Sequence, residues 1–328
     1  MQANDSAMKQ AGVLAPTIVD GALEDVTWED ARAVNLANWE DRVPIHEVGY
    51  EIERFDDPDF ISGVIAQDLP ELERHLPGRS LRGLDVCHLQ CHIGTDTVSL
   101  VRAGAASVTG VDFSPSALAA AKRLADRVGV AAEWVETDVL EARAAVVGEF
   151  DVVYTSIGTI GWLADLSRWA KQIAALLKPG GLFYFRDMHP TLGSLDDGET
   201  GGLEFRYLYF PNGQAQTWDD GETYIDTEIG EAGGVAPIAH RKTYDWPHSV
   251  SEILNALIDA GLEIIRVDEG QIIPWRALNL MEEVGASGDT WHGYALPEPL
   301  RSRVPMTLTV IARKPAADAY RTARPAIC

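Results

Sequence analysis

Residues 84–138 alternate strand-like and helix-like segments in an order that few folds accommodate. The strand-like runs are LDVCHL, SVTGVDF and AEWVETD, and the segments with helical spacing between them are GTDTVSLVRAG and PSALAAAKRLADRVG. Alternating strands and helices build a parallel sheet with crossover helices. The apolar runs FDVVYTSI and LFYFRDMHP continue this pattern. Residues 81–189 therefore predict an α/β fold with a doubly wound, mostly parallel sheet.

Two of the predicted strands end in an acidic residue. Asp112 closes the second strand and Asp138 closes the third. Because the carboxyl ends of parallel strands meet at one edge of a sheet, both carboxylates should face one crevice, where α/β folds bind their ligands. This layout is typical of a nucleoside-binding half-domain.

The turn after the first strand argues against a dinucleotide. A pyrophosphate site needs the glycines of G-x-G-x-x-G, so that the backbone can approach the phosphates. Here only Gly94 is present, and the bulky residues His88, Gln90 and His92 fill the turn. A ligand without phosphate is therefore favoured over a nicotinamide cofactor.

Three segments together resemble class I S-adenosylmethionine-dependent methyltransferases. They are HLQCHIGTDT after the first strand, VTGVDFS at the second, and the turn KPGG at residues 178–181. HLQCHIGTDT is similar to a subgroup in which the usual glycine-rich first motif is replaced. The resemblance covers residues 81–189 closely and 246–313 in layout. It implies a mostly parallel, seven-stranded sheet and S-adenosylmethionine as the cofactor.

The resemblance also implies roles for single residues. Asp112 would accept hydrogen bonds from both ribose hydroxyls, and Phe113 would flank the adenine. Asp138 would accept from the adenine amine. Because His88 stands where the family has an acid, Gln90 or backbone carbonyls would receive the methionine amine. The implied cofactor-binding residues are His88, Gln90, Cys91, Gly94, Asp112, Phe113, Ser114, Asp138, Val139, Thr155 and Ser156.

Two residues are candidates for catalysis. His189 ends the fifth predicted strand on the edge where Asp112 and Asp138 end, and an imidazole there can take a proton near neutral pH. A structural role for His189 stays open. Tyr50 belongs to the N-terminal segment, which could fold over the site.

The composition excludes some partners. The formal net charge is −23, which disfavours nucleic acid and anionic membranes. No apolar run reaches the length of a membrane span, no signal peptide is visible, and three cysteines suggest no disulfide framework, so we expect a cytoplasmic protein. Because the spacing of Cys87, His88, Cys91 and His92 scatters their side chains, we expect no metal.

The chain divides into four parts. Residues 1–24 predict a flexible N-terminus, 25–80 a helical cap, 81–313 the catalytic domain and 314–328 a tail. Within the domain, residues 191–245 break the α/β pattern with alternating runs, which predicts an inserted antiparallel β-lid. Its aromatic residues could sandwich a flat substrate or form the insertion's own core. They are Phe205, Tyr207, Tyr209, Trp218 and Tyr224.

The resemblance implies methyl transfer to a small organic acceptor, aromatic or natural-product-like, at oxygen, nitrogen or carbon. Two alternatives stay open at this point: a protein that binds the cofactor without turnover, and a nicotinamide-dependent oxidoreductase. A homo-oligomer that exchanges the N-terminal helices is also possible.

Overall fold

The computed structural model describes residues 21–198, 202–210, 212–219, 221, 223, 234–285 and 293–316. The predictions for residues 1–20 and for most of the tail lie outside these residues, as does Tyr224.

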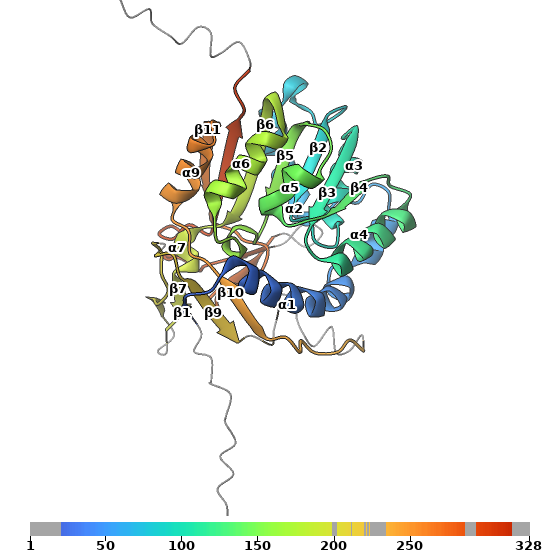
Figure 1. Cartoon of the computed structure of the whole chain (residues 1–328). Helices are drawn as coiled ribbons and strands as arrows, with labels where there is room; N and C mark the ends of the chain where they lie inside the picture. The colour runs from blue at the N-terminus through green and yellow to red at the C-terminus, as the bar shows by residue number, and fades with distance from the viewer. Residues whose placement is uncertain are drawn as a thin grey trace, which may run out of the picture.

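A seven-stranded sheet forms the centre of the molecule (Figure 1). Its order is β11-β14-β6-β5-β2-β3-β4, and β14 runs antiparallel to both of its neighbours, β6 and β11. This confirms the predicted fold class. The strands are β2 (Asp85–Leu89), β3 (Ser107–Asp112), β4 (Glu133–Glu136), β5 (Phe150–Ser156), β6 (Leu177–Met188), β11 (Glu263–Gly270) and β14 (Thr307–Arg313).

Helices cover both faces of this sheet. On one face, α6 (Leu166–Leu176) and α9 (Val250–Asp259) bury Trp169 and Leu257 against strand residues such as Phe183. On the other face, α2 (Gly63–Arg74) and α3 (Thr95–Arg102) pack on Tyr154 and its neighbours. Two further helices of the domain are α4 (Pro115–Val128) and α5 (Ala142–Ala145). The middle strands are apolar on both sides because both of their faces are covered.

The long N-terminal helix α1 (Trp28–Gly49) lies across the carboxyl edge of the sheet (Figure 1). Thr27 caps it by accepting from the N–H of Asp30. Glu40 accepts from the hydroxyl of Ser114 at the end of β3, and this contact holds the helix over the edge. By contrast, α2 packs on a face of the sheet, so the predicted cap consists of two differently placed helices.

The predicted insertion contains antiparallel strands. It includes α7 (Pro190–Gly193), β7 (Leu195–Asp197), β8 (Leu203–Phe205), β9 (Ala215–Asp219) and β10 (Lys242–Asp245). β9 pairs with β10 and also with β1 (Ala22–Glu24), so the insertion is joined to the N-terminal segment. A second insertion between β11 and β14 carries the hairpin of β12 (Glu282–Val284) and β13 (Gly293–Ala295), which the sequence pattern does not reveal.

Within the part of the chain that the structure describes, no helix combines the length and the apolar character that crossing a membrane requires.

Candidate functional site

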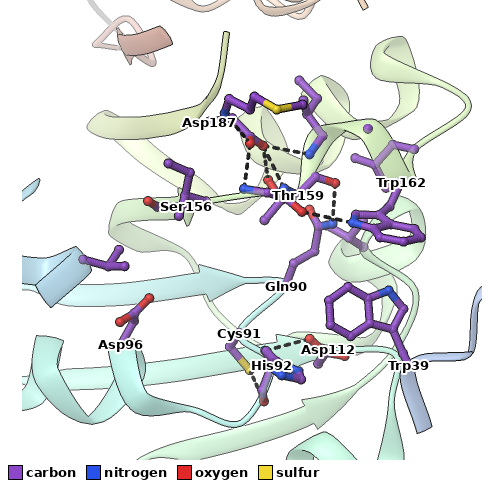
Figure 2. Close-up of a pocket in the computed structure, with 18 of the residues that line it drawn as sticks. Trp39, Gln90, Cys91, His92, Asp96, Asp112, Ser156, Thr159, Trp162 and Asp187 are labelled. Carbon is purple, nitrogen blue, oxygen red and sulfur yellow. Dashed lines mark hydrogen bonds between the residues drawn. The ribbon is translucent and has the colours of Figure 1, made fainter. Parts of the chain in front are cut away.

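A cavity of about 620 Å³ opens at the carboxyl edge of the sheet (Figure 2). The ends of β2, β3, β4 and β5 form its floor, and α1 and both insertions contribute walls. Most of the residues implied for the cofactor line it. They are His88, Gln90, Cys91, Asp112, Phe113, Ser114, Asp138, Val139 and Ser156.

The end of β4 holds Asp138 against helix α1. Its carboxylate accepts from the indole N–H of Trp28 and from the backbone N–H of Leu140, both at 2.9 Å. The Nε of Arg32 lies 3.2 Å from the same carboxylate, and the Arg32 guanidinium lies 5.7 Å from the ring centre of Phe113. Helix α1 therefore contributes two side chains, Trp28 and Arg32, beside the position where the resemblance places adenine.

The end of β3 presents Asp112 to the cavity (Figure 2). Its two oxygens accept the backbone N–H groups of His92 at 2.8 Å and Ser114 at 3.0 Å. A carboxylate offers about four acceptor sites, so these bonds leave Asp112 able to accept from the hydroxyls of a ribose. Burial raises the pKa of Asp112 to about 6, although the hydrogen bonds from backbone N–H groups act to lower it. A bound diol that donates to the carboxylate would favour its charged form.

The turn after β2 replaces glycines by residues in left-handed conformation. Gln90 has φ 56° and His92 has φ 48°. The turn is held by the Cys91 N–H, which donates to the carbonyl of Val111 at 3.0 Å, and by the Gln90 amide, which donates to the carbonyl of Thr159 at 3.0 Å. Hydrogen bonds to neighbouring segments thus hold this turn tight without the usual glycines.

Gly94 does not line the cavity, although the resemblance implied a cofactor contact. It precedes α3 with φ 77°, and a Cβ there would come within 2.6 Å of the Ala121 side chain and 2.7 Å of the Trp134 ring. Gly94 is therefore required by close packing against α4 and β4.

Several buried polar atoms on the cavity wall have no hydrogen-bond partner among the described residues, and they include His88 Nε2, Gln90 Oε1 and Ser156 Oγ. The other ring nitrogen of His88, Nδ1, lies 2.8 Å from the hydroxyl of Thr97. Burial lowers the pKa of His88 to about 3, so its ring is neutral. Buried groups of this kind require partners, and these atoms can accept hydrogen bonds from the amine of S-adenosylmethionine. Thr155 is buried beside them and does not line the cavity.

Asp187, on β6, organises the loop that follows β5 (Figure 2). Its carboxylate accepts from the backbone N–H groups of Gly158 at 2.6 Å, Thr159 at 2.8 Å, Ile160 at 2.9 Å and Met188 at 2.6 Å. It also accepts from the Thr159 hydroxyl at 2.9 Å. With five donors, Asp187 is a positioning residue, and its oxygens are not available as a base.

The structure corrects the placement of His189. Its Nδ1 accepts from the N–H of Thr191 at 3.0 Å and caps α7, and its Nε2 lies 2.9 Å from the carboxylate of Glu269. His189 does not line the cavity. Because Pro190 begins a helix directly after it, the ring turns back onto the backbone. The Nδ1 of His189 is therefore used within the chain and its Nε2 faces Glu269, so these contacts place the ring outside the cavity.

Tyr50 does line the cavity, at the C-terminal end of α1. Its ring stacks on the buried His46 with a centroid distance of 5.3 Å. His46 Nδ1 lies 2.7 Å from His92 Nε2, and Trp39 packs edge-on against both imidazoles. Burial lowers the pKa of both histidines, so their rings are neutral. The guanidinium of Arg42 lies 5.4 Å from the ring centre of Trp39 and brings a positive charge to this wall.

Sequence reasoning missed Trp28, Arg32, Asp96 and Trp162 as cavity residues. Trp28 and Arg32 carry a signal only in their spacing, which places them four residues apart on one face of a helix.

The two internal cysteines, Cys87 and Cys91, are free and buried. Burial raises the pKa of both thiols, so they stay protonated. In the described ranges, no three His, Cys, Asp or Glu side chains are grouped in a way that could hold a metal ion.

Comparison with known proteins identifies relatives of this chain. A family profile described as "Methyltransferase domain" matches residues 87–183. The ubiquinone biosynthesis O-methyltransferase of Methylobacterium sp. is 30% identical over 190 residues, covering 55% of this chain and 73% of that protein. The demethylmenaquinone methyltransferase of Thermus thermophilus is 31% identical over 137 residues, covering 35% of this chain and 60% of that protein.

Among solved structures, one similar protein is a putative S-adenosylmethionine-dependent methyltransferase from Listeria monocytogenes. It is 18% identical with a TM-score of 0.49, covering 76% of this chain and 98% of that one. The chain belongs to the class I S-adenosylmethionine-dependent methyltransferases, and S-adenosylmethionine is its cofactor.

Proposed function

We propose that this methyltransferase acts on a small, flat aromatic acceptor and methylates a hydroxyl group on its ring. The observation that carries the proposal is the aromatic wall beyond the end of β5. Trp162 comes from the loop after β5, Tyr209 from the first insertion and Trp275 from the second, and all three line the cavity. Aromatic side chains of this kind can hold a planar ring by stacking and apolar burial.

The curated relatives support the same class of acceptor. Their names place one in ubiquinone biosynthesis as an O-methyltransferase and give demethylmenaquinone as the substrate of the other. Family membership also favours methyl transfer over nicotinamide chemistry, and over cofactor binding without turnover.

When bound, S-adenosylmethionine supplies a methyl group on a sulfonium leaving group, so the protein contributes mainly orientation and desolvation. The loop held by Asp187 joins the cofactor end of the cavity to the aromatic wall. Its Thr159 carbonyl accepts from Gln90, and its Trp162 ring packs edge-on against Trp39 with a centroid distance of 5.3 Å.

The test is transfer of a labelled methyl group from S-adenosylmethionine to a panel of acceptors. We expect transfer to catechols and hydroquinones, and none to aliphatic alcohols or amines of similar size. Transfer to the aliphatic compounds alone would contradict the proposal. Binding of S-adenosylhomocysteine without transfer to any aromatic compound would also count against it.

Replacing Trp275 by alanine should separate the acceptor from the cofactor. Because this side chain belongs to the second insertion, away from the ends of β3 and β4, we expect KM for an aromatic acceptor to rise about tenfold, the effect of losing one stacked ring. The affinity for S-adenosylhomocysteine should stay within about twofold. Phe205→Ala, an exposed aromatic outside the cavity, is the matched control. An unchanged KM in Trp275→Ala would remove this wall from the acceptor site.

A further inference from the structure

The order of the strands sets the direction in which the cofactor lies. Asp138 lies two residues after β4 and Asp112 ends the adjacent β3, and β2 and β5 follow in the sheet. Neighbouring strands lie about 4.8 Å apart. With adenine at β4 and ribose at β3, the methionine portion must lie over the ends of β2 and β5.

A carboxylate that the first motif does not account for lies at this place. Asp96, in the first turn of α3, lines the cavity, and Figure 2 shows its carboxylate pointing into it. One oxygen, Oδ1, accepts from the hydroxyl of Ser62 at 2.5 Å. The other oxygen, Oδ2, has no hydrogen-bond partner among the described residues. Asp96 therefore offers a free acceptor atom and a negative charge to a ligand.

The neighbouring groups can accept hydrogen bonds and carry no charge. His88 is neutral, and within the described part of the chain neither its buried Nε2 nor the Ser156 hydroxyl on the wall has a hydrogen-bond partner. Thr97, which holds the His88 ring, directly follows Asp96 in α3, so His88 and Asp96 are supported by the same helical turn. A primary ammonium group has three donors, and hydrogen bonds to a charged partner are the strong ones.

We propose that Asp96 holds the ammonium group of the cofactor's methionine portion and supplies the negative charge that His88 cannot. His88 Nε2 and Gln90 Oε1 would accept the remaining ammonium hydrogens. This inference concerns the cofactor, so it does not depend on which acceptor is methylated.

The competing explanation is that Asp96 only supports α2. Ser62 caps that helix by accepting from the N–H of Ile65, and its hydroxyl hydrogen goes to Asp96. A purely structural Asp96 would affect every ligand of the cavity to the same extent.

The test compares two ligands by calorimetry on the full chain. S-Adenosylhomocysteine carries the amino acid portion, and 5′-methylthioadenosine has the same adenine and ribose without it. We expect Asp96→Asn to lower the affinity for S-adenosylhomocysteine about 10- to 100-fold, as for a lost hydrogen bond to a charged group. The affinity for 5′-methylthioadenosine should fall less than about twofold. The matched control is Glu51→Gln, which removes a carboxylate from the exposed rim of the same cavity. It should leave both affinities within about twofold.

Equal weakening of both ligands, or of neither, would overturn the proposal. If the wild-type protein bound neither ligand, the assignment of the cofactor to this cavity would fail instead, which is a distinguishable result.

A measurement on the wild-type protein covers the case in which Asp96→Asn does not fold. Burial raises the pKa of Asp96 to about 6. The charged or titratable groups that face it are Asp68 on α2, Arg186 on β6, Tyr154 on β5 and His88 on β2. Asp68 and Arg186 form a buried ion pair, and the pKa values of Tyr154 and His88 lie far from this range.

The charged form of Asp96 binds the ammonium group, and at pH 5, one unit below its pKa, only about one tenth of Asp96 is charged. Lowering the pH from 7.5 to 5 should therefore reduce the preference for S-adenosylhomocysteine over 5′-methylthioadenosine about tenfold. Asp112 contacts the part that both ligands share, so its titration cancels in the ratio. A ratio that does not change with pH would contradict the proposal.

Discussion

Asp187→Asn should destabilise the protein by about 3 kcal/mol or more, because either orientation of the amide leaves two backbone N–H groups without an acceptor. In one orientation the N–H groups of Thr159 and Ile160 lose their partner, and in the other those of Gly158 and Met188. The amide hydrogens would also face these donors. Methyl transfer should be lost as well, since the loop that joins the cofactor and acceptor ends would no longer be fixed.

Chemical denaturation and the turnover number measure the two effects. Asp165→Asn is the matched control, because Asp165 caps α6 through one backbone hydrogen bond and asparagine is an equally good cap. A loss of turnover in Asp187→Asn with unchanged stability would instead give Asp187 a direct chemical role, contrary to the present account.

Asp112→Ala should weaken the binding of S-adenosylhomocysteine by about 1.5–3 kcal/mol, the range for hydrogen bonds to a charged group. The carboxylate is expected to receive the ribose hydroxyls, and it also fixes the turn after β2 through the N–H of His92. Both contributions are lost in the alanine variant. In contrast to Asp96→Asn, this substitution should also weaken the binding of 5′-methylthioadenosine, because that ligand keeps the ribose.

Calorimetry with both ligands decides this prediction, after circular dichroism has confirmed that the variant is folded. Asp126→Ala, on the exposed side of α4, removes the same side chain outside the cavity and should leave both affinities unchanged. If Asp112→Ala bound S-adenosylhomocysteine as tightly as the wild type does, the ribose would have to lie elsewhere.

The core of the fold was accessible from the sequence because its signals are local. Strands buried on both faces appear as continuous apolar runs, and the helices between them carry strong caps such as Ser114 before α4. The same locality placed Asp112 at the end of β3 and Asp138 just past the end of β4 on the same edge, since the direction of parallel strands determines where they end.

The site could be predicted only in part, because side-chain direction depends on tertiary contacts. His189 does follow an apolar strand, but its ring turns toward Thr191 and Glu269 once Pro190 begins a helix. Gly94 looked like a residue of a ligand-binding turn, whereas contact with Ala121 explains it. The position of Asp96 in the cavity depends on how α3 packs, and the motif alone does not show it.

The contacts of the N-terminal helix with the site, and the strands of the second insertion, could not be predicted for a related reason. Trp28 and Arg32 contact Asp138, which lies more than one hundred residues away in the sequence, so no local pattern predicts the contact. The strands of the second insertion, β12 and β13, are three residues long, too short for a periodic signal.

A crystal structure of the full chain with S-adenosylhomocysteine tests the central claim most directly. The account predicts adenine beside Phe113 and Asp138, both ribose hydroxyls on Asp112, and the amine over the end of β2 within hydrogen-bond distance of Asp96. A cofactor that lies in the opposite direction, or outside this cavity, would contradict the assignment of the site.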